Sequence, residues 1–279
     1  MTTGSNNTAV GDGAGGAVTT GASNTAIGAD SLDANSTGDS NTAIGKSALT
    51  ANTTADLNVA IGAAAMEANT TGANNVAVGA LALDANTTAG SNVAVGYAAL
   101  SANTTGTNNT SIGTGSLELN TTTSGNTAVG TNALEANVAA NNTAVGLNAL
   151  VANTTGTENV AVGKSAGAAV TTGSYNTALG ASALDVSTTG ASNVAVGNNA
   201  LGANTTASNN TAIGTDALLL NTTGASNVAV GQGALDSNTT ASNNVAVGKS
   251  ALAANTTGSS NVAVGLSACL LYTSDAADE

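Results

Sequence analysis

The sequence predicts a β-solenoid built from parallel, stacked coils of 17 residues. A pentapeptide of the form N-[T/V]-A-[V/I/L]-G recurs along the chain at steps of 17 residues, except for one step of 16 from Asn126 to Asn142. Hydrophobic residues make up 42% of the chain but aromatic residues only 1%, whereas large cores depend on bulky aromatic side chains. One short strand per repeat cannot bury its own face, so the coils must stack around a thin core. The sixteen pentapeptides begin at Asn7, Asn24, Asn41, Asn58, Asn75, Asn92, Asn109, Asn126, Asn142, Asn159, Asn176, Asn193, Asn210, Asn227, Asn244 and Asn261.

We number each coil from 1 at the asparagine of its pentapeptide, as in the coil from Asn244 to Ser260. Positions 2 to 4 alternate between branched residues and alanine, which predicts a short strand, and the glycine at position 5 permits a turn. Positions 6 to 11, with the pattern xxALxA, are rich in helix-forming residues. We therefore expect a short helical turn opposite the strand, supported by stacking because it is too short to persist alone.

Two positions vary together and indicate what lies inside the coil. Position 9 is leucine or methionine in nearly every coil, and position 12 is usually asparagine. Where position 9 is Gly15 or Gly167, position 12 becomes Val18 or Val170. Apolar volume lost at one position thus returns at the other, so both side chains must reach the same interior region. We expect a leucine column in the core, with the asparagines at position 12 at a corner, either stacked on one another or bonded to the turn backbone.

Position 3 is alanine in every coil except one, where it is Ser111, and two interpretations are open. If positions 2 and 4 face inward, the alanines form an outer stripe of small residues that packs against another surface. Alternatively, the alanines face inward, because a thin core has room for nothing larger.

The repeat covers residues 2–268, which we expect to form a single solenoid domain cut from a longer fibre at both ends. The first residues match the end of a coil, with Met1 where an asparagine is expected. Residues 269–279 (CLLYTSDAADE) fit no position of the repeat and resemble the translation of a sequencing adapter. We interpret them as a non-native tail, which includes the only cysteine, Cys269.

Charge and composition exclude several functions. With 3 Lys and Arg against 16 Asp and Glu, the formal charge is −13, so nucleic-acid binding and attraction to anionic membranes are excluded. The chain has no histidine, which is the commonest general base and zinc ligand. All three lysines, Lys46, Lys164 and Lys249, fall at position 6 of distant coils. We predict no enzymatic activity, no catalytic residues and no cofactor.

Acidic residues gather at coil position 10 and offer the only candidate metal ligands. Stacking would place Glu67 beside Asp84, and Glu118 beside Glu135, at about one coil spacing. Like charges at that distance repel unless a cation such as calcium intervenes. The favoured interpretation is a solvated charged stripe, because the nonapeptide pattern of calcium-binding rolls is absent. The sequence thus predicts no metal site and leaves these four residues as weak candidates. The acidic residues at this position are Asp33, Glu67, Asp84, Glu118, Glu135, Asp185 and Asp236.

Paired threonines recur at positions 13 and 14, as in Thr53-Thr54 and Thr256-Thr257. Threonine ladders at coil spacing could order water and adsorb to ice. Adjacent threonines in a turn point in different directions, however, whereas a flat ice-matching face needs threonines two apart on a strand. Stacked structural turns are therefore the favoured interpretation of these pairs.

The tandem pentapeptide, as in Asn24 to Gly28 and Asn58 to Gly62, resembles the YadA-like head repeats of trimeric autotransporter adhesins. The longer form, with Ala-Leu-x-x-Asn-Thr-Thr-Gly, is similar to repeats in bacterial surface proteins and phage tail-fibre proteins. That repeat family usually has shorter coils without the Leu-x-Ala-Asn-Thr-Thr stretch. The resemblance implies a parallel solenoid head, a homotrimer displayed outside the cell or on its surface, and a host matrix or surface receptor as the ligand.

The sequence and the resemblance together favour a structural and adhesive segment of an extracellular fibre, which binds through a repetitive surface without catalysis. A phage tail-fibre shaft is the first alternative, and an ice-binding solenoid is the second. We expect this segment to make no direct contact with a membrane.

Overall fold

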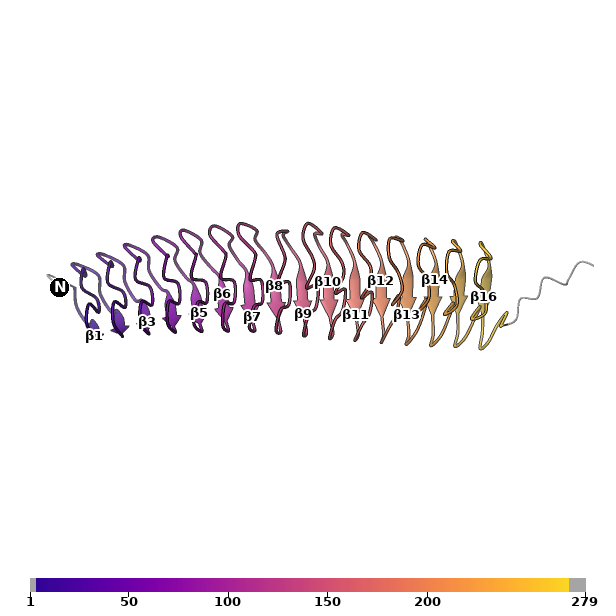
Figure 1. Ribbon diagram of the computed structural model, residues 1–279, viewed down its shortest axis with the longest axis horizontal. Helices are drawn as coiled ribbons and strands as arrows, with labels where there is room; N and C mark the ends of the chain where they lie inside the picture. The colour runs from indigo at the N-terminus through magenta and orange to yellow at the C-terminus, as the bar shows by residue number, and fades with distance from the viewer. Residues whose placement is uncertain (1–3, 271–279) are drawn as a thin grey trace, which may run out of the picture. The chain divides into compact units, whose positions relative to one another are not determined.

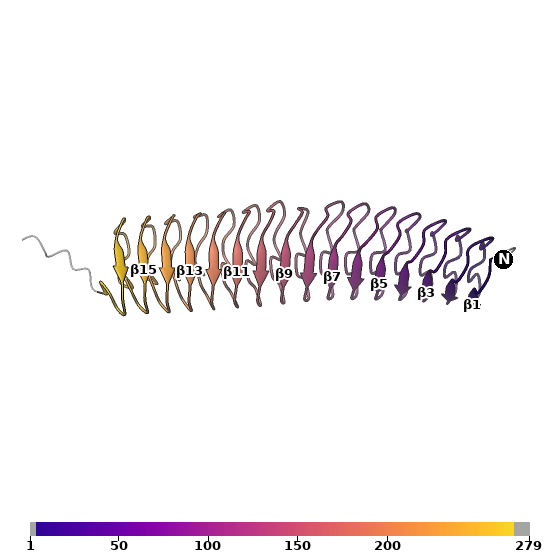
Figure 2. The ribbon, with the colours of Figure 1, turned by 180° about the vertical axis from the view of Figure 1, so that it is seen from behind.

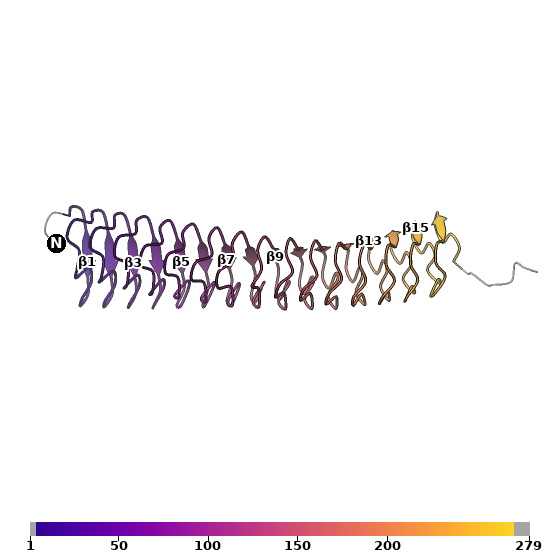
Figure 3. The same ribbon diagram turned by 90° about the horizontal axis from the view of Figure 1, so that it is seen from above.

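The structure, a computed structural model, describes residues 4–270 and divides the chain into two units, Met1–Asn142 and Thr143–Glu279. Within the described residues, each unit is a parallel β-solenoid with eight strands, one short strand to each coil (Figure 1). Seen from behind and from above, neighbouring coils within a unit follow the same path (Figures 2 and 3). The predicted fold class is confirmed, while a single domain over residues 2–268 stays a prediction.

The first unit contains β1 (Thr8–Val10), β2 (Thr25–Ile27), β3 (Thr42–Ile44), β4 (Val59–Ile61), β5 (Val76–Val78), β6 (Val93–Val95), β7 (Thr110–Ile112) and β8 (Thr127–Val129). The second unit contains β9 (Thr143–Val145), β10 (Val160–Val162), β11 (Thr177–Leu179), β12 (Val194–Val196), β13 (Thr211–Ile213), β14 (Val228–Val230), β15 (Val245–Val247) and β16 (Val262–Val264). Within a unit, successive strands pair in parallel at equal coil positions, so that Ala43 of β3 lies opposite Ala60 of β4. The repeat length thereby sets the register of the sheet.

The strands turn their central residue inward. Ala43, Ala60 and Ala77 at position 3 are fully buried, whereas the side chains at positions 2 and 4 lie half-buried or exposed on the outside. An outer alanine stripe is therefore wrong, and the interior interpretation of position 3 is confirmed. The alanines at position 8 and the leucines at position 9 are buried too, and they leave room for only a small side chain on the strand.

Ser111, the exception at position 3, is matched by Ser116 at position 8 of the same coil. Their two Oγ atoms lie 2.6 Å apart, and the Ser111 hydroxyl also donates to the Ser116 carbonyl oxygen at 2.8 Å. The Ser116 hydroxyl reaches the Gly113 carbonyl oxygen at 2.8 Å. The two serines thus satisfy each other in an otherwise apolar interior, and positions 3 and 8 of one coil lie against each other.

The segment at positions 6 to 11 is not the expected helical turn, because the described residues contain no helix. Residues at positions 7 and 9 take positive φ angles instead, as in Ser47 (57°) and Leu49 (52°). The Leu49 amide then donates to the Ala65 carbonyl oxygen of the next coil at 3.0 Å. Alternating left-handed residues direct the backbone groups toward neighbouring coils, so intercoil hydrogen bonds replace those of a helix.

Asparagines form two buried ladders, a ladder being one coil position followed through successive coils. At position 1, the Asn58 side chain donates to the Gly72 carbonyl oxygen at 2.9 Å, and its Oδ1 accepts the Asn75 amide of the next coil at 2.9 Å. At position 12, Asn69 donates to Asn52 Oδ1 at 3.1 Å and to the Gly72 carbonyl oxygen at 3.0 Å. The carbonyl at position 15 thus accepts both amides and closes the coil. The prediction for position 12 is confirmed in both its forms.

The leucine column at position 9 is also confirmed. Leu32, Leu83 and Leu100 are fully buried, as is Met66 at the same position. In the coil with Gly167, a Cβ at that glycine would lie 3.0 Å from Leu150 Cδ2 and 3.5 Å from Val170 Cγ2. The two side chains therefore fill the space that the missing leucine leaves, as the covariation indicates.

The glycine at position 5 is required by both its backbone angle and its surroundings. Gly96 has a φ of 138°, and a Cβ there would lie 2.6 Å from the carbonyl carbon and oxygen of Gly113 in the next coil. A side chain would thus collide with backbone that cannot move away. The glycines allow the coils to approach within strand-pairing distance.

The short coil, residues 126–141, loses its residue in the turn after position 12. Asn137 donates to the Ala139 carbonyl oxygen, two residues on, at 2.6 Å, whereas other coils span three residues, as from Asn120 to Thr123 at 3.1 Å. Positions 1 to 12 keep their usual arrangement, with Leu134 fully buried. Of the proposed tail, only Cys269 and Leu270 lie within the described residues. The exposed Cys269 takes the backbone of position 9, with a φ of 52°.

Candidate binding surfaces

In both units, the outer face of the sheet carries the side chains at strand positions 2 and 4. These are threonine or valine at position 2 and valine, isoleucine or leucine at position 4. Several are well exposed, among them Ile61 at 37% and Val162 at 40%. None of the described strands has a charged residue. We call this surface the strand face, and its chemistry is that of a regular array of methyl and hydroxyl groups.

The four acidic candidates lie on the turn side of the first unit, at position 10. Burial raises the pKa of Asp84, and the neighbouring Glu67 carboxylate adds to this rise, while backbone amides oppose it. The two carboxylates are thus close enough to interact, as stacking predicts. Ser101 occupies position 10 in the coil between Asp84 and Glu118, and it interrupts the acidic row. Within residues 4–270, no three His, Cys, Asp or Glu side chains are grouped so as to hold a metal ion.

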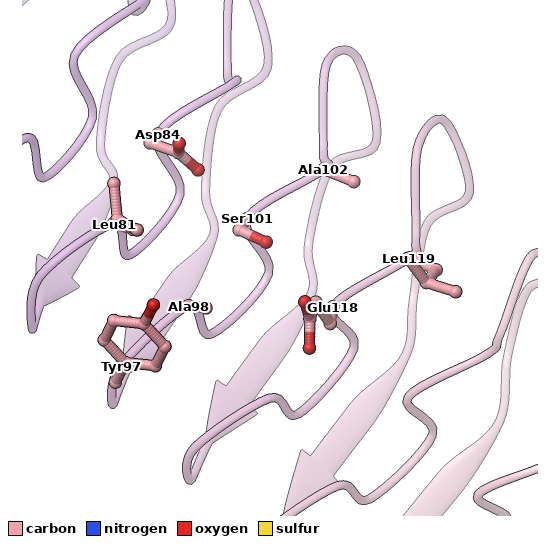
Figure 4. Close-up of a pocket in the computed structure, with 8 residues that line it drawn as sticks. All are labelled: Leu81, Asp84, Tyr97, Ala98, Ser101, Ala102, Glu118 and Leu119. Carbon is pink, nitrogen blue, oxygen red and sulfur yellow. The ribbon is translucent and has the colours of Figure 1, made fainter.

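A hollow of about 270 Å³ opens on this turn side, above Ser101 (Figure 4). Tyr97, at position 6, lies on one side of it, and the carboxylates of Asp84 and Glu118 come from the two neighbouring coils (Figure 4). Asp84 Oδ1 is buried and accepts no hydrogen bond in the structure. The hollow is lined by Leu81, Asp84, Tyr97, Ala98, Ser101, Ala102, Glu118 and Leu119.

A second hollow, of about 500 Å³, occupies the same positions in the second unit. It opens where Gly202 stands at position 10 between coils that carry Asp185 and Leu219. Burial raises the pKa of Asp185, although a backbone amide and the Ser182 hydroxyl oppose the rise. Both hollows thus form where a small residue at position 10 lies between larger ones. Only the first contains an aromatic ring and two carboxylates.

The hollows were not predicted from the sequence, because each coil position was followed along the chain by itself and different positions of neighbouring coils were not combined. The available signal was a combination across three neighbouring coils: Tyr97 at position 6, Leu119 at position 11, and Ser101 between two acids at position 10. Side chains from different coils meet there because stacking brings residues 17 apart side by side.

The two threonines of each turn have different roles. The Thr53 hydroxyl at position 13 donates to the Thr70 carbonyl oxygen of the next coil at 3.2 Å, and Thr70 repeats the contact with Thr87 at 3.0 Å. The threonines at position 14, such as Thr54 and Thr71, are exposed. Position 13 therefore holds coils together, and of the two turn positions it is position 14 that presents its threonine hydroxyls to solvent.

Neither the lysines nor comparison with known proteins identifies a further candidate surface. Lys46, Lys164 and Lys249 are exposed at position 6 of separate coils. No helix long and apolar enough to span a membrane occurs within residues 4–270. No protein-family model and no curated protein matches the chain.

Proposed function

We propose that this chain is a structural and adhesive segment of an extracellular fibre, displayed at a cell surface and without catalytic activity. The observation that supports it most is the intercoil bonding. The same hydrogen bonds, from position 1 to position 1 and from position 13 to position 13, join coil after coil within each unit. Such stacking gives a stiff support whose outer side chains recur at fixed intervals. Its ligand would be a host matrix or surface molecule, bound at many equivalent positions.

Assembly as a homotrimer is part of this proposal, and the strand face supports it. An uncharged Val, Ile or Leu side chain lies half-buried or exposed on every described strand of that face, and extended apolar surfaces of this kind are commonly buried between subunits. Light scattering of the purified chain should give three times the chain mass of 26.0 kDa.

A pair of substitutions tests whether the strand face makes that contact. Lysine at the outward positions of Val78 and Val95 should convert the trimer into monomers, because it places charges in the interface. The matched control puts lysine at the exposed Thr71 and Thr88, on the turn, and should leave the mass unchanged. A wild-type monomer would reject the homotrimer, and trimers that survive the valine substitutions would reject this interface.

Adhesion is tested with beads that carry the chain and a surface coated with collagen, as a representative matrix protein. If binding is distributed over the coils, deleting whole coils of 17 residues should weaken capture in steps. Capture that disappears with one particular coil would contradict distributed binding, and no capture above uncoated beads would remove collagen as a ligand.

The phage tail-fibre alternative is separated from the adhesin by the full reading frame, since the first predicts a chaperone-like C-terminus and the second a membrane-anchor barrel.

Ice binding is a second candidate function, supported by the exposed threonine row at position 14. The position-13 hydroxyls donate to backbone carbonyls, as Thr53 does to Thr70, so only one threonine per turn is available to order water. If the row binds ice, the purified chain should show thermal hysteresis, and valine at Thr54, Thr71 and Thr88 should reduce it. No hysteresis in the unmodified chain would eliminate this function.

A further inference from the structure

We propose that the hollow above Ser101 is a specific site for an alkylammonium group, the chemistry of a lysine side chain or of a linear polyamine. This goes beyond the proposed fibre function, because the site is local to three coils of the first unit and does not require distributed adhesion. The proposal rests on the aromatic ring, the charge and the shape of the hollow together.

The charge around the hollow is uncompensated. Asp84 and Glu118 approach it from the coils on either side of Ser101 (Figure 4), and no lysine of the chain stands in those coils. The Asp84 carboxylate lines the hollow while its Oδ1 oxygen is buried without a hydrogen bond. Backbone amides of Asp84 and Ala85 donate to this carboxylate, but no cationic side chain of these three coils neutralises its charge, so a cation in the hollow would be attracted to it. An ammonium ion above Ser101 would stand about one coil spacing from each acid-bearing coil.

The remaining lining suits an alkyl chain that carries the charge. Tyr97 is 58% exposed, and its ring lies at the edge of the hollow with Leu81 and Ala98 (Figure 4). A tyrosine face attracts a cation through its ring quadrupole, and the neighbouring aliphatic side chains favour methylene groups over water. A bare metal ion would leave this apolar lining unused, and the described carboxylates do not form a metal-binding group.

A second exposed tyrosine and a second hollow in the same chain serve as controls for this site. Tyr175 is exposed to the same extent as Tyr97, at 58%, but it stands at position 17 and lines neither hollow. The hollow of the second unit has one carboxylate, Asp185, and no aromatic ring. Neither place should bind an alkylammonium group.

The test follows the fluorine NMR signals of the chain made with 3-fluorotyrosine, each assigned by replacing one tyrosine with phenylalanine. Hexylammonium at pH 7 should shift the Tyr97 signal to saturation and leave the Tyr175 signal in place. Hexanol, with the same alkyl chain and no charge, should bind at least tenfold more weakly. Equal effects of hexylammonium and hexanol, or equal shifts at both tyrosines, would overturn the proposal.

Two variants separate the hollow from general surface charge. Ser101→Leu fills the hollow, and it should fold because Leu219 occupies position 10 in another coil; it should abolish saturation at Tyr97. Asp84→Asn combined with Glu118→Gln should weaken hexylammonium binding by about tenfold or more, whereas Asp33→Asn, a position-10 acid away from the hollow, should not change it. Circular dichroism and urea unfolding check that each variant is folded, and undiminished binding in folded Ser101→Leu would refute the site.

Two further ligands distinguish the sources of the ammonium group. Nα-acetyl-lysine amide represents a lysine of a protein partner, and spermidine represents a free polyamine. Saturable binding of either supports the site, and the tighter of the two identifies the source. If neither binds, the proposal fails, while the fibre function is judged separately by the trimer and adhesion measurements.

Discussion

The leucine ladder at position 9 and the asparagine ladder at position 1 pass through the same interior but stabilise it in different ways. Position 9 accepts Leu83, Met66 or Gly167, provided that a neighbour restores the lost volume. Position 1 is asparagine in all sixteen coils. Its side-chain amide donates a hydrogen bond to a carbonyl oxygen of its own coil, and its Oδ1 accepts one from the backbone N–H of the next coil. Apolar packing tolerates exchange of volume, whereas a closed set of hydrogen bonds tolerates no missing member.

Leu100→Ala should give the largest loss of stability, about 3 kcal/mol, because it opens a cavity at a fully buried site in a core too thin to collapse around it. Urea unfolding together with hydrogen exchange of peptides from the altered coil measures the effect. Leu100→Met is the matched control and should cost less than about 1.5 kcal/mol, as Met66 occupies the same position elsewhere. Equal losses for the two variants would mean that volume is not what matters at position 9.

Asn92→Leu should cost somewhat less, about 2 kcal/mol, although the two side chains are similar in size. The Asn109 amide, which Asn92 Oδ1 accepts at 3.0 Å, would be left buried without a partner. The Gly106 carbonyl oxygen would still accept a hydrogen bond from the Asn103 side chain, at 3.0 Å. Hydrogen exchange should therefore accelerate most at the Asn109 amide. A variant as stable as the wild type would contradict the distinction between the two ladders.

A double-mutant cycle at Gly167 and Val170 tests the exchange of volume directly. Gly167→Leu alone overfills the space, since a Cβ there already lies 3.0 Å from Leu150 Cδ2, and Val170→Asn alone removes apolar volume. The double variant restores the usual pair of residues, so it should be more stable than the sum of the single changes predicts, with a coupling of about 1 kcal/mol or more. Additive losses in the urea midpoints would show that the two positions do not share one space.

The smallest effect should come from the outer surface, at Asp84. Burial raises the pKa of this carboxyl from its ordinary value of 3.8, so its ionised form is less favourable in the folded chain than in the unfolded chain. This cost is present at neutral pH and disappears as the pH falls through the raised pKa to below 3.8. Asp84→Asn should therefore be slightly more stable than the wild type at pH 7, and the difference should close in acid. The measurement is the urea midpoint of both proteins as a function of pH. A stability difference that grows in acid would contradict the prediction.

Much of the coil could be predicted from the sequence because the repeats can be compared with one another. Sixteen copies show which positions never change, and the pairs Gly15 with Val18 and Gly167 with Val170 show which positions share space. The strand, the leucine ladder and the asparagine ladder at position 12 follow from this comparison. The face of the strand did not, because a three-residue strand with period two fits either orientation. Only the size of the space beside Leu49 and Ala48 decides it, in favour of alanine inside.

The turn at positions 6 to 11 misled the sequence analysis for a different reason. Its Ala and Leu content favours a helix in isolation, but the leucine at position 9 adopts φ angles near 50° in coil after coil, as in Leu117 (49°) and Leu184 (55°). This conformation costs about 1–2 kcal/mol for a residue with a side chain, and full burial of leucine contributes a gain of similar or larger size. A partial signal was present at position 7, where Gly115, Asn132 and Asp216 are types that tolerate positive φ.

The hydrogen bonds between coils also determine how the chain would respond to tension. Within a unit they point from one coil to the next, as from Thr53 to Thr70, so a pull along the stacking direction acts on all intercoil interfaces of the unit in series, and the weakest of them opens first. A coil that opens exchanges a rise of about 4.8 Å for an extended segment of 17 residues, and so lengthens the chain by roughly 50 Å. Each opened coil leaves an equivalent coil behind it, which can accept the freed segment again when the load falls. A thread of such coils would yield stepwise under a sudden load and recover its length afterwards.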